Sequence, residues 1–129
     1  MIVSVVDTSA VVRALVEGGV LLHRLGAPGE AFAAPAHLDA EVGHALRSLV
    51  RGGKITGDQG SGCIDDLQRL VVLRVPLPAL VERAWALRDN ATFYDALYVS
   101  LAEMLGANLV TSDAKFLGIP GLRCTVELL

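Results

Sequence analysis

The sequence lacks several features that would assign it to large classes of protein. It has no uninterrupted apolar run of about 18 residues, which argues against a membrane-spanning helix. Its only cysteines, Cys63 and Cys124, form no CxxC pair, so we expect two reduced thiols rather than a disulfide framework. The first residues carry no basic leader, and Asp7 interrupts their apolar run. We therefore expect a cytoplasmic protein without a signal peptide.

Positive charge is also scarce. The chain has 11 Lys and Arg residues against 14 Asp and Glu residues, which gives a formal net charge of −3 at pH 7. This balance argues against a protein that binds nucleic acid through bulk positive charge, so any such contact requires a local basic patch. Arg47, Arg51 and Lys54 form the one evident basic cluster. We expect these residues to be mostly solvated, with some basic rim near a functional site.

Apolar residues, by contrast, are abundant. They make up 53% of the 129 residues, and the mean hydropathy is +0.52. This length predicts a single domain over residues 1–129. A small domain exposes much of its surface, so the apolar excess suggests that another chain covers part of it. We expect a homodimer, a tightly held partner, or both.

Strand-like and helix-like segments alternate along the chain. The patterns predict strands over 2–6, 31–34, 71–75, 108–111 and 123–128, and helices over 10–16, 20–25, 37–51, 79–88 and 94–105. The polar, glycine-rich segment 56–62 is expected to lead into a further helix that ends near residue 70. Trp85 and Phe93 are expected in the core. Such alternation predicts an α/β fold with a central parallel sheet covered on both sides.

Two carboxylates follow predicted strands. Asp7 ends the apolar run IVSVV, and Asp113 follows NLVTS. In parallel sheets, ligands bind beyond the carboxyl ends of the strands, where both residues would lie. Each could also simply cap the helix that follows it, because Asp is favoured at that position by about 1 kcal/mol. Neither residue identifies a site by itself.

Two further acids belong to predicted helices. Asp95 lies in the first turn of the nearly all-apolar segment YDALYVSLAEML, where the helix dipole favours it and Thr92 could cap the same turn. Glu41 and Asp39 flank the apolar stripe of the helix over 37–51 on its two sides. Helical periodicity does not choose between Glu41 and Asp39.

Converging carboxylates repel each other unless a cation lies among them. Mg²⁺ or Mn²⁺ would suit an all-oxygen site, and such a site without a paired nucleophile suits hydrolysis of a phosphodiester. Thr8 and Ser112, each next to one of the acids, could hold waters or orient carboxylates. A metal site would explain why Asp7 lies at the mouth of a hydrophobic core.

Four short motifs in order resemble the PIN-domain ribonucleases, and specifically the VapC-like toxins of toxin–antitoxin modules. They are VVDTSAVV, EVGHAL, FYDALYVSLAEML and LVTSDAKF, and together they span nearly the whole chain. The resemblance implies a three-layer α/β/α fold and a metal-binding catalytic set of Asp7, Glu41, Asp95 and Asp113, and it selects Glu41 over Asp39. It also implies one or two Mg²⁺ or Mn²⁺ ions, an RNA substrate, a homodimer, and a cognate antitoxin whose tail covers the pocket.

Other classes fit the sequence less well. A receiver-type signalling domain would need an acidic pair after its first strand, and a haloacid-dehalogenase-type phosphatase would need an Asp where Ser9 stands. His37, Glu41 and His44 share a helical face and could hold Zn²⁺, but they do not form the HExxH order. A PIN-like fold used only for binding is a further alternative, against which the four intact acids argue.

Overall fold

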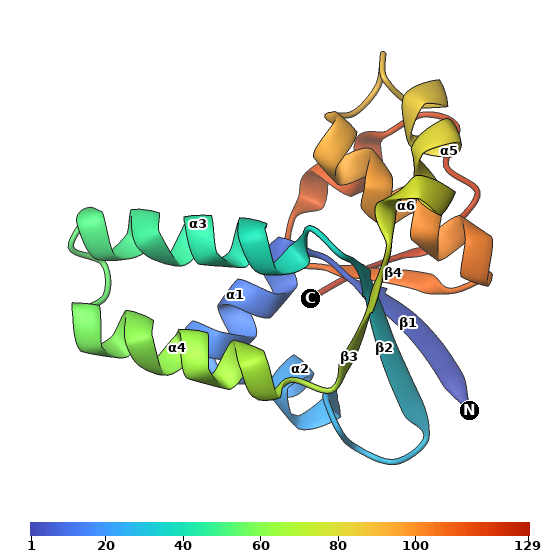
Figure 1. The fold of residues 1–129 in the computed structure, drawn as a ribbon. Helices are drawn as coiled ribbons and strands as arrows, with labels where there is room; N and C mark the ends of the chain where they lie inside the picture. The colour runs from blue at the N-terminus through green and yellow to red at the C-terminus, as the bar shows by residue number, and fades with distance from the viewer.

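Five parallel strands form one sheet in the computed structural model, which describes residues 1–129 (Figure 1). The strands are β1 (Ile2–Val6), β2 (Glu30–Pro35), β3 (Val72–Val75), β4 (Asn108–Thr111) and β5 (Val126–Leu128). Their order across the sheet is β3-β2-β1-β4-β5, and every neighbouring pair is parallel. The predicted parallel sheet is therefore confirmed.

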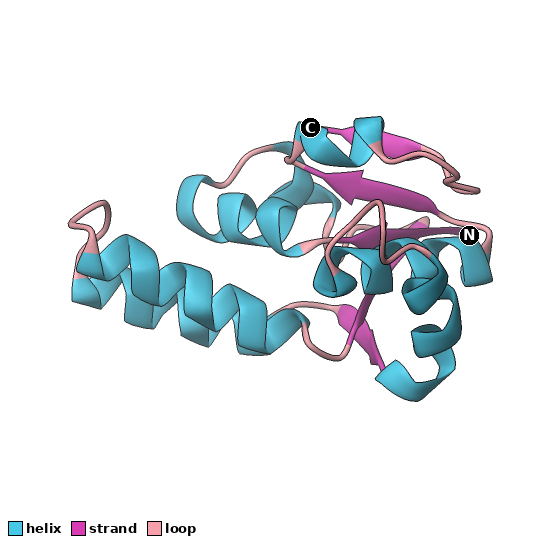
Figure 2. Cartoon of the chain, turned by 90° about the horizontal axis from the view of Figure 1, so that it is seen from above, coloured by secondary structure: helices cyan, strands magenta, loops and turns pink.

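Helices cover both faces of this sheet. The chain forms α1 (Thr8–Glu17), α2 (Val20–Arg24), α3 (Leu38–Arg51), α4 (Gly57–Arg69), α5 (Val81–Ala86) and α6 (Phe93–Leu105), with short 3₁₀ turns η1 (Leu77–Leu80) and η2 (Ala114–Gly118). Figures 1 and 2 show α3 and α4 as a long hairpin that extends away from the strands, with α5 and α6 on the other side. This is the expected three-layer α/β/α arrangement. None of the helices is long and apolar enough to cross a membrane.

Helix α6 is the most deeply buried helix. Its residues 96–102 are all buried, and it contacts β1, β2 and β4. The middle of this helix is therefore surrounded by neighbours, as its sequence predicted, whereas Phe93, Met104 and Leu105 near its ends are exposed. Asp95, in the first turn, directly precedes this buried segment.

The glycine-rich segment 56–62 corrects an expectation. Residues 57–62 form the first part of helix α4 rather than preceding it, and Thr56 is the N-cap residue of this helix. The hydroxyl of Thr56 accepts a hydrogen bond from the backbone N–H of Gln59 (3.1 Å), and the Gln59 side chain accepts one from the backbone N–H of Thr56 (2.8 Å). A Cβ atom at Gly60 would lie 2.8 Å from Cγ2 of Val50, so glycine permits the close approach of α3 and α4.

Trp85 and Phe93 are not core residues, contrary to the prediction. The side chain of Trp85 is 60% exposed, with the guanidinium of Arg88 5.0 Å from its ring centre, and Phe93 is also exposed. The buried residue of the short helix α5 is Ala84, and Trp85 beside it occupies an exposed position of this helix. The last strand is also shorter than expected, because the N–H of Arg123 donates to a carboxylate oxygen of Glu103 (2.8 Å) instead of to a neighbouring strand.

Candidate active site

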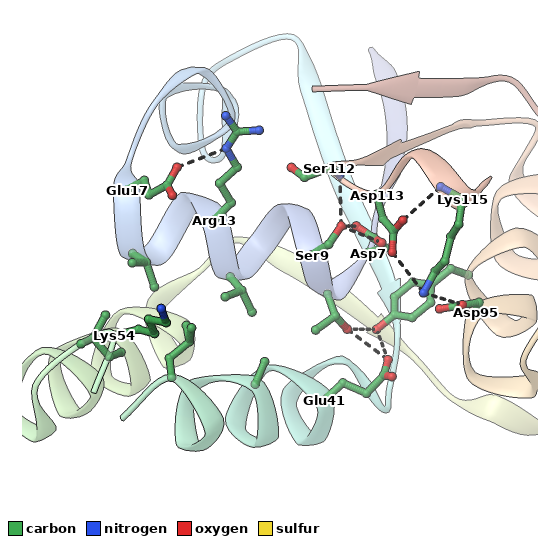
Figure 3. A pocket seen from close by; sticks show the side chains of 17 residues that line it. Asp7, Ser9, Arg13, Glu17, Glu41, Lys54, Asp95, Ser112, Asp113 and Lys115 are labelled. Carbon is green, nitrogen blue, oxygen red and sulfur yellow. Dashed lines mark hydrogen bonds and ion pairs between the residues drawn. The ribbon is translucent and has the colours of Figure 1, made fainter. Parts of the chain in front are cut away.

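All four acids of the resemblance line one pocket of about 810 Å³ (Figure 3). Asp7 follows β1, Glu41 lies in α3, Asp95 in α6 and Asp113 after β4. The chain leaves β1 toward β2 on one side, whereas β4 lies on the other side of β1. The pocket is thus at the point where the strand order reverses, which is where open α/β sheets bind ligands.

Asp7 is held by neutral hydrogen-bond donors. Its carboxylate is only 4% exposed and accepts bonds from the hydroxyls of Ser9 (2.9 and 3.0 Å) and Thr111 (2.9 Å). It also accepts a bond from the backbone N–H of Ala10 (3.1 Å), so it caps α1 while facing the pocket. Burial raises the pKa of Asp7, and these bonds offset only part of that effect.

Glu41 is clamped through one of its two oxygens. Its Oε1 accepts hydrogen bonds from the hydroxyls of Tyr98 (2.8 Å) and Thr8 (3.0 Å), and Nε2 of His37 lies 3.2 Å away. Burial alone would raise the pKa of Glu41, but the bonds from His37, Tyr98 and Thr8 lower it overall. No side chain bonds Oε2, which leaves that oxygen available to a ligand.

Asp95 and Asp113 are bridged by a cation from the chain itself. Nζ of Lys115 lies 3.0 Å from Oδ2 of Asp95 and 3.1 Å from Oδ2 of Asp113 (Figure 3). The backbone N–H of Lys115 also donates to Oδ1 of Asp113 (3.0 Å), so Asp113 caps the turn η2. Burial alone would raise the pKa of Asp113, but both contacts with Lys115 lower it overall.

The structure separates Glu41 from its neighbour Asp39. Asp39 pairs with the guanidinium of Arg74 on β3 through two bonds of 2.9 and 3.1 Å. It does not line the pocket, whereas Glu41 does. The arrangement agrees with the choice of Glu41 that the resemblance implied, and it shows why periodicity alone left both residues open.

Several residues that hold the acids were not singled out in the sequence. Ser9, Thr111 and Lys115 all contact a carboxylate of the set. Thr8 was expected to assist, and it does so by holding Glu41. The hydroxyl of Ser112 bonds to neither acid, so it does not orient a carboxylate in this structure. The DTS motif contains the one sequence signal that could have identified Ser9. This residue follows Asp7 by two positions, a spacing within reach of local side-chain hydrogen bonds.

The donor set fits a hard divalent cation in type. The four acids offer only oxygen, which Mg²⁺ and Mn²⁺ prefer. In this conformation, however, no three His, Cys, Asp or Glu side chains lie close enough together to bind one ion. The same observation applies to the zinc alternative of His37, Glu41 and His44, of which only His37 and Glu41 are in contact (3.2 Å).

Besides Lys115, two basic residues line the pocket. Of the basic cluster in the sequence, only Lys54 lines the pocket, while Arg47 and Arg51 lie over a separate depression between α3 and α4. Arg13 also lines the pocket but pairs with Glu17 (3.2 Å). The pocket wall between α1 and α3 is apolar and consists of Val12, Val16, Ala45, Leu49 and Ile55.

Comparison with known proteins identifies the family. Residues 4–122 match the model of the PIN domain. The chain belongs to the PIN-domain family. It is 45% identical over 127 residues to Ribonuclease VapC1 of Mycobacterium tuberculosis, covering 96% of both chains, and this similarity places it among the VapC proteins.

Two crystal structures share the fold at low sequence identity. One is VapBC2 from Rickettsia felis bound to a DNA fragment from its promoter, with a TM-score of 0.71, 20% identity and 98% of both chains covered. The other is VapC20 of Mycobacterium tuberculosis, described as a sarcin–ricin loop cleaving toxin. Its TM-score is 0.64 at 21% identity, covering 93% of this PIN domain and 95% of that chain.

Proposed function

We propose that this PIN-domain protein is a metal-dependent endoribonuclease and the toxin of a toxin–antitoxin module. The observation that carries the proposal is the convergence of Asp7, Glu41, Asp95 and Asp113 on one pocket in a chain related to Ribonuclease VapC1. The proposal takes residues 1–129 as a single PIN domain that hydrolyses RNA phosphodiester bonds.

The four acids would hold one or two Mg²⁺ or Mn²⁺ ions. When bound, the metal lowers the pKa of a water molecule and neutralises charge on the phosphoryl oxygens. The protein supplies the orientation of the ligands. Ser9 and Thr111 fix the carboxylate of Asp7, and Tyr98 and Thr8 fix Oε1 of Glu41 while Oε2 stays available.

The same family assignment supports our proposals about the partners of the protein. The R. felis neighbour is a VapBC assembly, and a further structural neighbour is a toxin–antitoxin complex from Klebsiella pneumoniae. We propose a cognate antitoxin whose tail covers the pocket, where the apolar wall between α1 and α3 would receive it. Exposed apolar side chains such as Trp85 and Met104 support a homodimer, and we place the protein in the cytoplasm.

Cleavage of RNA by the purified protein tests the activity directly. Total RNA is incubated with the wild type, with Asp7→Asn and with Asp65→Asn, each in Mn²⁺ and in chelator. Asp65 is an exposed acid of α4 outside the pocket, so its variant controls for the loss of one negative charge. We expect cleavage only with metal, and a loss of more than about 100-fold in Asp7→Asn alone.

The outcomes separate the alternatives. Asp7→Asn should remain folded, because asparagine can still accept the bond from the N–H of Ala10 that caps α1. Full activity of a folded Asp7→Asn variant, or cleavage that persists in chelator, would contradict the proposal. RNA binding by the wild type without turnover under all conditions would instead favour the non-catalytic alternative.

A further inference from the structure

Lys115 is the only basic side chain that forms an ion pair with Asp7, Asp95 or Asp113. Its ammonium lies between Asp95 and Asp113, and both contacts involve the Oδ2 oxygens (3.0 and 3.1 Å; Figure 3). The chain contains one other lysine, Lys54, which lines the same pocket without pairing with an acid. The protein thus carries its own monovalent cation within the acidic set.

The oxygen of Asp113 that Lys115 contacts is the one that a metal would need. Oδ1 of Asp113 already accepts the backbone N–H of Lys115 at the start of η2 (3.0 Å), so Oδ2 is its remaining free oxygen. The ammonium of Lys115 bonds that oxygen. A metal ion that bound this oxygen of Asp113 would lie next to the ammonium of Lys115. Repulsion between the two cations therefore opposes their simultaneous binding at Asp113.

The side chain of Lys115 can leave without disturbing the fold. It is 54% exposed, whereas the side chain of Asp95 is largely buried. Lysine has a long flexible stem and its ammonium is strongly hydrated, so moving it into water costs little. The backbone bond from Lys115 to Asp113 does not depend on where the ammonium lies.

We propose that Lys115 is an internal counter-ion that pairs with Asp95 and Asp113 in the metal-free protein and competes with the divalent ion for their oxygens. This inference rests on the proposed metal-dependent function. Metal binding at this pair expels the ammonium from the pair. Lys115 therefore lowers the affinity of the site for metal and, in return, offsets the repulsion between the two carboxylates when metal is absent.

Calorimetric titration with Mn²⁺ tests the competition without measuring activity. The proteins are the wild type, Lys115→Met, Lys115→Arg and the charge-matched control Lys54→Met. We expect Lys115→Met to bind Mn²⁺ about tenfold more tightly, because a positive charge has been removed from between two ligands. Lys54→Met should bind like the wild type, and Lys115→Arg should bind no more tightly than the wild type.

Thermal unfolding provides a second, independent readout. In chelator, Lys115→Met should melt at a lower temperature than Lys54→Met, because Asp95 and Asp113 then face each other without a cation. In saturating Mn²⁺ this difference should disappear. A merely structural role would lower the melting temperature equally in both conditions and leave the Mn²⁺ affinity unchanged.

The failure of this inference is distinguishable from the failure of the proposed function. If the wild type binds Mn²⁺ and Lys115→Met binds it equally or more weakly, the competition is refuted while the metal site stands. If neither the wild type nor Lys115→Met binds Mn²⁺, the metal site itself is refuted, and the inference falls with it.

Discussion

The acidic pocket consists of two halves that are held together by different physics. Asp7 and Glu41 are fixed mainly by neutral hydroxyls, from Ser9 and Thr111 in one case and from Thr8 and Tyr98 in the other. Asp95 and Asp113 are held by the charge of an ammonium. The first half we call the hydroxyl-held pair, and the second the lysine-held pair.

The two pairs differ in what their partners provide: hydroxyls orient the carboxylates of the first pair, whereas an ammonium compensates the charge of the second. Hydroxyl donors orient a carboxylate without neutralising it, so the hydroxyl-held pair is oriented in advance for a cation. An ammonium compensates charge directly but occupies the place that a metal would take. The pocket therefore combines one pair that is oriented in advance with one pair that must exchange its cation.

The largest expected effect is the loss of RNA cleavage when Glu41 of the hydroxyl-held pair, rather than its neighbour Asp39, is neutralised. Glu41→Gln should reduce metal-dependent RNA cleavage by more than about 100-fold, because a charged ligand is lost while its size is kept. Asp39→Asn is the matched control on the same helix, and it should leave cleavage unchanged because Asp39 pairs with Arg74 outside the pocket. Greater loss in Asp39→Asn than in Glu41→Gln would reverse the assignment.

The next effect concerns the donor that orients Glu41. Tyr98 is only 1% exposed, and its hydroxyl contacts both Glu41 and Thr8 (2.7 Å to the latter). Tyr98→Phe should weaken Mn²⁺ binding and reduce cleavage by about 10-fold or more, as loss of partners that orient metal ligands does elsewhere.

Tyr94→Phe is the control for that variant. Tyr94 lies on the same helix but is 62% exposed, and its hydroxyl makes no hydrogen bond with another residue. It should therefore resemble the wild type in both Mn²⁺ affinity and cleavage. Equal Mn²⁺ affinity in Tyr98→Phe and the wild type would show that the hydroxyl does not orient Glu41 for metal.

The sequence predicted the hydroxyl-held pair only in part. Asp7 could be located because it ends a buried strand, and its two possible roles turn out to coexist, since it caps α1 and faces the pocket. The choice of Glu41 over Asp39 needed the family resemblance, because both flank the same apolar stripe. Only the fold reveals that Arg74, far along the chain, pairs with Asp39.

The lysine-held pair was harder to predict for the same reason. Lys115 lies two residues from Asp113, but its contact with Asp95 joins residues from different elements. Periodicity describes one element at a time, so it cannot report a bridge between η2 and α6. The start of α4 is predicted too late for a different reason. The glycine content of segment 56–62 indicates a loop, although the Thr56–Gln59 capping pattern begins the helix there.

Neutralising one acid from each pair should change the metal-free stability in opposite directions. Asp7→Asn should raise the melting temperature in chelator, because a buried charge is removed while the amide oxygen still accepts from the N–H of Ala10 and the hydroxyl of Thr111 can turn to accept from the amide nitrogen. Asp113→Asn should lower it, because the pairing with Lys115 is lost. Because the ion pair between Lys115 and Asp113 is solvent-exposed, we expect Asp113→Asn to lower the free energy of unfolding by at most about 1 kcal/mol.

The same variants should lose their response to metal. In the wild type, Mn²⁺ at about ten times its dissociation constant should add about 1.4 kcal/mol to the free energy of unfolding. Thermal unfolding with and without Mn²⁺ measures both effects in one experiment. A decrease in the metal-free melting temperature of Asp7→Asn would contradict the view that the Asp7 charge is costly.

The smallest expected effect is a difference in pH dependence between the pairs. Burial raises the pKa of Asp7, so the native state binds this proton more readily than the unfolded state does. The resulting stability is fully present below the ordinary pKa of about 3.8 and is lost as the pH rises through the native pKa. Burial alone would raise the pKa of Asp113, but its contacts with Lys115 lower it overall. The contribution of Asp113 to stability is therefore present above about pH 3.8 and is lost as the pH falls through its native pKa.

Urea unfolding in chelator, at a series of pH values upward from about pH 4, tests these opposite signs. The stability advantage of Asp7→Asn over the wild type should grow as the pH rises, by at most about 1.4 kcal/mol per pH unit for one proton. Asp113→Asn should show its disadvantage throughout this range, and that disadvantage should shrink only in more acidic solution. If the advantage of Asp7→Asn were independent of pH, the ionisation of Asp7 would not be coupled to folding, and the two halves of the pocket would not differ in the way that their contacts imply.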